Sequence, residues 1–126
     1  MKTLRKCISA MVLLAIVVGA AMATWAHSFP ENETPAAGQN VTTPPPEVSI
    51  KFDAPIEKLF AKLEVTGVDG RDEAVGAPAV SDDGLRLSVK VGALKAGDYW
   101  VKWSVVCIDT HHSQGSYTFT VANGGS

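Results

Sequence analysis

The sequence predicts an all-β fold, a sandwich of two sheets with about seven strands, and two observations support this. Turn-forming residues recur at short intervals, at positions 35–38, 43–46, 69–70, 82–84 and 95–98. The segments between them alternate apolar and polar residues, with the period of two expected of a strand that buries one face. Short strands at this spacing are typical of a Greek-key, immunoglobulin-like β-sandwich.

Five segments show the alternation clearly. The first has apolar residues at 48, 50 and 52, and the second at 63 and 65. The third, fourth and fifth cover 85–91, 99–105 and 117–121, and Trp103 is expected on the buried face of the fourth. Residues 56–61 could form a single helical turn. The prolines at 44–46 make a stiff connector that is too short to separate two domains.

The first 26 residues have the pattern of a secretory signal peptide. Lys2, Arg5 and Lys6 precede an apolar segment at 8–23, and Thr24 and Ala26 place small residues at positions −3 and −1 of a cleavage site. We expect cleavage after Ala26, a sandwich domain over 27–122 and a flexible tail at 123–126. Cleavage a few residues earlier, at 23, would leave His27 as an ordinary side chain.

The composition of the mature chain limits its function. The signal segment holds three of the eleven Lys and Arg residues and no Asp or Glu, so 8 basic and 13 acidic residues remain, a formal charge of −5. A nucleic-acid partner is therefore not expected, because it requires clustered Lys and Arg. Cys107 is the single cysteine after residue 26, which excludes an intramolecular disulfide. All three methionines lie within residues 1–26.

Three histidines suggest a metal site. Cleavage after Ala26 would give His27 a free α-amino group beside its imidazole, so that one residue offers two nitrogen ligands. Asp109 and His111 are two residues apart, and in an extended segment their side chains would leave the chain on the same side. Three nitrogens and a carboxylate suit the tetragonal preference of Cu(II), although zinc would accept the same atoms. Alternatively, Asp109 caps backbone groups in a turn and the histidines are only solvated.

Several motifs occur together in an order that resembles the CopC family of periplasmic copper resistance proteins. His27 is followed eight residues later by the turn Pro35-Ala36-Ala37-Gly38, and residues 45–52 resemble the next strand of the family. Residues 94–106 resemble its penultimate strand, and 109–111 with 115–119 resemble its Asp-x-His motif and closing strand. The resemblance covers residues 27 to 121.

The resemblance implies a β-sandwich that binds one Cu(II) per chain through His27, Asp109 and His111. It also implies a monomeric periplasmic protein that is not an enzyme and delivers copper to a CopD-type inner-membrane protein. Some family members hold Cu(I) in a methionine-rich segment. This chain departs from them because its mature part has no methionine.

Other functions and roles stay open from the sequence. A histidine-brace copper oxidase resembling polysaccharide monooxygenases would also use an N-terminal histidine, and a metal-free adhesion module would use no metal. We expect His112 to be exposed or to contact the ligands from outside, and Cys107 to be a small buried residue. Phe29 and Pro30 are expected to attach the N-terminal segment to the sandwich.

Overall fold

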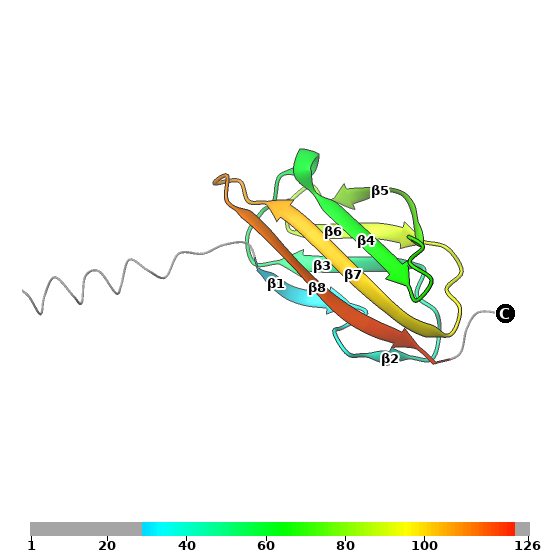
Figure 1. Cartoon of the computed structure of the whole chain (residues 1–126). Helices are drawn as coiled ribbons and strands as arrows, with labels where there is room; N and C mark the ends of the chain where they lie inside the picture. Colours follow the sequence, from blue (N-terminus) through cyan, green and yellow to red (C-terminus); the bar gives the residue numbers. More distant parts are fainter. Residues whose placement is uncertain (1–28, 123–126) are drawn as a thin grey trace, which may run out of the picture.

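The computed structural model describes residues 29–122, which form two four-stranded sheets packed face to face (Figure 1). The first sheet has the strand order β1-β3-β6-β5 and the second β2-β8-β7-β4. The strands are β1 (Pro30–Thr34), β2 (Asn40–Val41), β3 (Glu47–Phe52), β4 (Lys62–Gly67), β5 (Ala74–Val80), β6 (Arg86–Val91), β7 (Gly97–Val106) and β8 (His112–Val121). Neighbouring strands are antiparallel except β2 and β8, which are parallel.

The predicted all-β sandwich is confirmed, and the five alternating segments are β3, β4, β6, β7 and β8. The short 3₁₀ helix η1 (Lys58–Phe60) lies within the segment where a helical turn was expected. Strands β1 and β5 lie at the two edges of the first sheet, and β2 has only two residues. Neither β1 nor β5 contains a buried residue, so the sequences of these two strands do not alternate clearly.

The core lies between the two sheets and consists of the inward side chains of the alternating segments. Trp103 is 7 % exposed, which confirms its expected place in the core, whereas Trp100 on the opposite face is 40 % exposed. The rings of Phe52 and Trp103 meet edge to face with centroids 5.3 Å apart, so this pair joins the two sheets.

The end of the sandwich that matters for the predicted site is on the left of Figure 1. The start of β1 and the loop between β7 and β8 both lie there. Strands β7 and β8 pair over ten residues each, from Gly97↔Val121 to Val106↔His112, so they hold that loop on a rigid hairpin. The predicted signal peptide, His27 and the predicted tail at 123–126 lie outside the described residues. Within 29–122, no helix is long and apolar enough to span a membrane.

Candidate metal centre

The loop between β7 and β8 is a tight turn closed by two backbone hydrogen bonds. The amide of Cys107 donates to the carbonyl of His111 at 2.8 Å, and the amide of Thr110 donates to the carbonyl of Cys107 at 2.9 Å. Thr110 has a φ of +76°, a left-handed conformation that costs a residue with a side chain about 1–2 kcal/mol. The expectation that Asp109 and His111 belong to an extended segment is therefore wrong, because the chain reverses direction at these residues.

The turn nevertheless brings Asp109 and His111 together. Asp109 Oδ2 lies 3.2 Å from His111 Nδ1, and the backbone amide of His111 donates to Asp109 Oδ1 at 3.3 Å. Both side chains are about half exposed, 41 % for Asp109 and 51 % for His111. The carboxylate therefore caps the turn, as the alternative interpretation expected, and also contacts the imidazole.

The electrostatics of the turn favour an ionised carboxylate. The hydrogen bond from the amide of His111 is the largest influence, and with the contact to the imidazole it lowers the pKa of Asp109 below its ordinary value. A carboxylate that stays ionised is always ready to bind a cation.

The third predicted ligand, His27, belongs to the N-terminal part of the chain. His27 lies outside the described residues, but Phe29, two residues later, is bonded to Asp53 through its backbone. Pro30 pairs with Phe52 at the start of β1. The expectation that Phe29 and Pro30 attach the N-terminal segment to the sandwich is thus confirmed. Among residues 29–122, no group of three or more His, Cys, Asp or Glu could hold a metal ion, and the structure brings together two of the three predicted ligands, Asp109 and His111.

His112 and Cys107, which lie close in sequence to Asp109 and His111, have different surroundings. His112 opens β8, is exposed, and its Nε2 lies 2.8 Å from the Oγ of Ser104 on β7. This agrees with its expected exposure. Cys107 is 3 % exposed and forms a β-bridge with Ile56, which confirms that it is buried.

The sequence did not single out Asp53. Its partner Phe29 is 24 residues away, so no local spacing could have indicated the contact.

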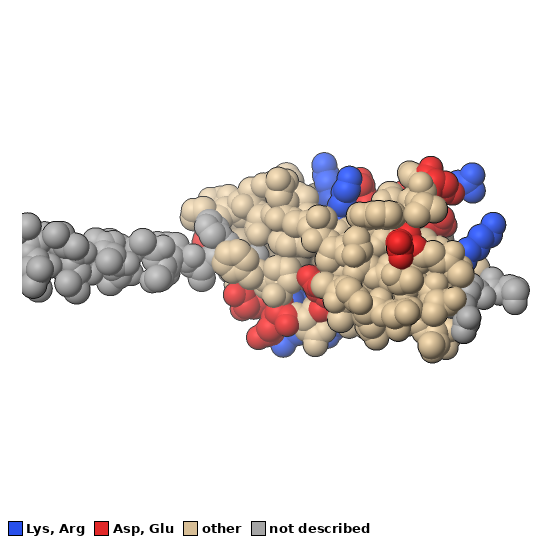
Figure 2. Space-filling view, turned by 60° about the horizontal axis from the view of Figure 1, so that its bottom comes forward, with Lys and Arg blue, Asp and Glu red and all other residues tan. Residues whose placement is uncertain are grey.

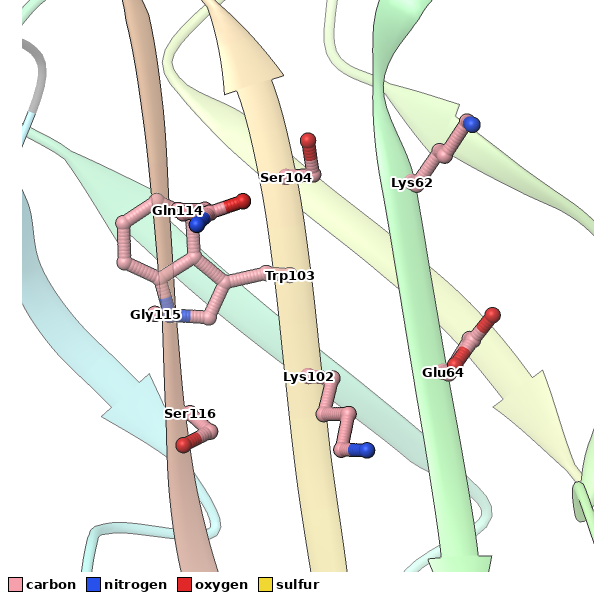
Figure 3. Close-up of a pocket in the computed structure, with 8 residues that line it drawn as sticks. All are labelled: Lys62, Glu64, Lys102, Trp103, Ser104, Gln114, Gly115 and Ser116. Atoms are coloured by element: carbon pink, nitrogen blue, oxygen red, sulfur yellow. The ribbon is translucent and has the colours of Figure 1, made fainter.

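A separate hollow among the described residues lies away from this turn. It has a volume of about 450 Å³ and lies on the outer face of the β8-β7-β4 sheet (Figure 3). The indole of Trp103 lies across Gly115 in this view, and polar or charged side chains surround them: Lys62, Glu64, Lys102, Ser104, Gln114 and Ser116. The hollow contains neither Asp109 nor His111, and none of its lining residues is a histidine or cysteine, so it is not the predicted metal site.

The charged residues are spread over the surface. Figure 2 shows Lys and Arg side chains in small separate groups, with uncharged surface between them and no continuous basic area on this face.

The donors fit a metal ion of intermediate hardness. One exposed imidazole and one ionised carboxylate lie within a few ångströms of each other on a rigid turn. Nitrogen and oxygen donors of this kind suit Cu(II) or Zn(II), and Cu(II) ranks above Zn(II) in affinity for such sites.

Comparison with known proteins supports one family. Residues 31–122 match the model of the CopC domain. The chain is 33 % identical to protein YobA of Escherichia coli strain K12 over 99 residues, which covers 77 % of this chain and 80 % of YobA. It is 31 % identical to copper resistance protein C of Escherichia coli over 114 residues, which covers 84 % of this chain and 90 % of the relative.

Two solved structures resemble the fold closely. The crystal structure of CopC from Methylosinus trichosporium OB3b has a TM-score of 0.72 and 27 % identity, and the match covers 79 % of this chain and 98 % of that one. PcoC, a methionine-rich copper resistance protein from Escherichia coli, has a TM-score of 0.65 and 27 % identity, with 76 % and 99 % covered.

Proposed function

Because the chain belongs to the CopC family of copper resistance proteins, we propose that it is a periplasmic Cu(II)-binding protein that sequesters copper or delivers it to a membrane transporter. It acts as a monomer and binds one Cu(II) ion. The ligands are the α-amino and imidazole nitrogens of His27, the imidazole of His111 and a carboxylate oxygen of Asp109. The observation that carries this proposal is the contact between Asp109 and His111 on an exposed turn.

The donor set explains why the ion is Cu(II). Nitrogen and oxygen donors stabilise Cu(II), whereas Cu(I) prefers sulfur. The three methionines of the sequence all precede residue 27, and Cys107 is buried. The absence of methionine after residue 26 distinguishes this protein from PcoC, a methionine-rich copper resistance protein.

The exposure of the site suits ligand exchange and not catalysis. Asp109 and His111 are both accessible, so the ligands of a second protein can reach the metal before Asp109 and His111 dissociate from it.

The surroundings of the turn support delivery to a partner protein. Ile108, directly before Asp109, is 61 % exposed and Leu59 is 90 % exposed, and both line one shallow depression. The same depression is bordered by three carboxylates and one lysine: Glu57, Asp82, Asp83 and Lys58. A depression lined by apolar and acidic side chains fits a partner surface that carries apolar and basic side chains, and we assign this role to a CopD-type inner-membrane protein.

The proposed binding can be tested by titration of the protein that begins at His27 with Cu(II) against a competing chelator. We expect one tightly bound ion per chain and a tetragonal Cu(II) spectrum. The matched control replaces Asp109 and His111 together by alanine, which should abolish tight binding. Equal binding by this control, or no binding by the unchanged protein, would contradict the proposal. Sustained formation of hydrogen peroxide from ascorbate and oxygen would instead favour the oxidase.

Delivery can be tested with membrane vesicles that contain the CopD-type partner. Replacing Leu59 and Ile108 by serine should leave Cu(II) affinity unchanged and slow the transfer of copper to the vesicles. Replacing Val68, which is exposed and does not line the depression, by serine is the control and should leave transfer unchanged.

A further inference from the structure

The shape of the hollow in Figure 3 follows from the register of β4, β7 and β8. Leu63, Trp103 and Gly115 lie opposite one another on these strands. Leu63 and Trp103 are buried between the sheets and Gly115 has no side chain, so this row projects no side chain from the outer face. The rows on either side project polar side chains outward, because successive residues of a strand point to opposite faces. The result is a polar hollow of about 450 Å³ across three strands, a size usual for a ligand site.

The indole of Trp103 offers an unused hydrogen-bond donor to this hollow. Its Nε1 lies next to Gly115, where an added Cβ would be 3.1 Å away, so the missing side chain leaves the N–H uncovered. Within residues 29–122 this N–H forms no hydrogen bond. The hydroxyl of Tyr117 is the single enclosed side-chain polar atom without a partner in that range, so the N–H of Trp103 is accessible to solvent. A residue that is 7 % exposed thus lines the hollow with its one side-chain donor unpaired.

The charged side chains of the hollow are also without ion pairs. Within the described part of the chain, Lys62, Glu64 and Lys102 form no salt bridge. Two lysines and one glutamate give the hollow a local charge of +1, whereas the chain from residue 27 onward has a formal charge of −5. Gln114 and Ser116 add groups that both donate and accept hydrogen bonds. The hollow therefore suits a ligand with a negative charge and several hydroxyl groups.

An exposed aromatic ring adjoins the hollow on the same face. Trp100 precedes Lys102 by two residues on β7, so both side chains project outward, and their Cα atoms are at most about 7 Å apart. Trp100 is 40 % exposed and lies between Thr66 and Thr118 of the neighbouring strands. An indole presents a flat apolar surface on which the C–H face of a sugar ring packs, while the hydroxyl groups at the rim of the sugar bond to polar neighbours.

We propose that this face of the β2-β8-β7-β4 sheet binds an acidic oligosaccharide. One sugar ring packs on Trp100, and the next occupies the hollow. There its carboxylate contacts Lys102 and the N–H of Trp103, and its hydroxyl groups bond to Gln114 and Ser116. The site shares no residue with the proposed copper site, so it does not depend on the proposed function.

The arrangement favours a saccharide over other anionic ligands. A free inorganic anion is too small to contact Trp100 and the hollow together. An extended peptide would pair with the edge of a sheet, whereas this site lies across the face of three strands. An oligosaccharide is long enough for both places and offers an apolar ring face to one and polar groups to the other.

Binding can be measured by nuclear magnetic resonance on the metal-free protein that begins at His27, which has two tryptophans and hence two indole N–H signals. The probe is tetragalacturonic acid. We expect saturable shifts of the indole N–H of Trp103 and of the backbone amides of 100–104 and 114–116. Cellotetraose, which has no carboxylate, should bind about tenfold more weakly, because it makes no charge-assisted hydrogen bond. Absence of a saturable shift with tetragalacturonic acid, or the same shifts with inorganic phosphate alone, would overturn the proposal.

Two substitutions with matched controls assign the binding to this face. Trp100→Ala and Lys102→Gln should each weaken binding of tetragalacturonic acid about tenfold, the scale of one aromatic contact or one charge-assisted hydrogen bond. Phe60→Ala removes an exposed aromatic ring on η1, and Lys90→Gln removes an exposed charge on β6 of the other sheet. Both controls should bind like the unchanged protein. Equal losses in the controls, or unchanged binding in Trp100→Ala and Lys102→Gln, would contradict a site on this face.

Discussion

Asp109 and His111 contact each other twice across a single intervening residue, once between side chains at 3.2 Å and once from the backbone amide of His111 to the carboxylate at 3.3 Å. The left-handed conformation of Thr110 between them turns the chain so that both contacts form. The turn itself therefore pre-assembles half of the proposed copper site, before any metal binds.

The first prediction concerns the two ligands of the turn. His111→Ala should weaken Cu(II) binding more than Asp109→Ala, because an imidazole nitrogen is a stronger donor to Cu(II) than a carboxylate oxygen. His112→Ala is the matched control and should change affinity little, since its ring is bonded to Ser104 on the neighbouring strand. Competition titrations measure all three. A greater loss for His112→Ala than for His111→Ala would show that the wrong histidine has been assigned.

The second prediction concerns pH. Unperturbed imidazole and α-amino groups have pKa values near ~6.5 and ~8, and both must lose a proton to bind metal. The pKa of Asp109 is lowered in the folded protein, so its carboxylate stays ionised throughout mild acid. Cu(II) affinity should thus fall steadily from about pH 7 to about pH 5 through the nitrogen ligands alone.

The pH profile can be assigned with one variant. Asp109→Asn should lower the affinity at every pH and leave the shape of the profile between about pH 5 and pH 7 unchanged. A profile that flattens in Asp109→Asn would mean that the carboxylate titrates in this range, contrary to its lowered pKa.

The third prediction concerns the oxidation state of copper. The sequence from residue 27 onward has no methionine, and Cys107 is buried. Reduction to Cu(I) should therefore release the ion or weaken its binding greatly. The measurement is a competition titration with a Cu(I) chelator under reducing conditions, with Cys107→Ser as the control. Tight retention of Cu(I) that disappears in Cys107→Ser would show that the cysteine is a ligand.

The fourth prediction tests the hairpin that carries the turn. A Cβ added at Gly115 would lie 2.6 Å from Cζ2 and 2.9 Å from Cε2 of Trp103, two atoms of a buried ring that cannot easily move. Gly115→Ala should lower the free energy of unfolding by about 1–3 kcal/mol, as is typical of overpacking. Gly92→Ala is the control, because a Cβ there meets no atom within 4 Å. Urea denaturation of both variants measures the difference, and equal stability would contradict the contact.

The strands of the core could be predicted from the sequence, because a buried face imposes a period of two on segments such as 48–52 and 99–105. The edge strands β1 and β5 could not, because few of their side chains face the core. The proximity of Asp109 and His111 was predicted from an extended geometry that does not exist. The two side chains are nevertheless close, because the left-handed conformation of Thr110 turns the chain and brings Asp109 and His111 into contact.

The contact between Asp53 and Phe29 lay beyond sequence reasoning. It depends on a hydrogen bond between a loop after β3 and the residue before β1, and neither residue type indicates the other. Such contacts follow from the path of the whole chain, whereas the pair on the turn follows from three consecutive residues.

The central claim is that the α-amino group of His27 binds Cu(II) together with its own imidazole, and one measurement tests it most directly. The Cu(II) affinity of the protein that begins at His27 is compared with that of a protein with one added glycine before His27. The added residue moves the amine away from the imidazole and destroys the chelate, whose advantage is the entropy saved by joining two ligands. The account predicts a loss of affinity of at least about a hundredfold and a changed Cu(II) spectrum. Equal affinity and identical spectra for the two proteins would contradict it.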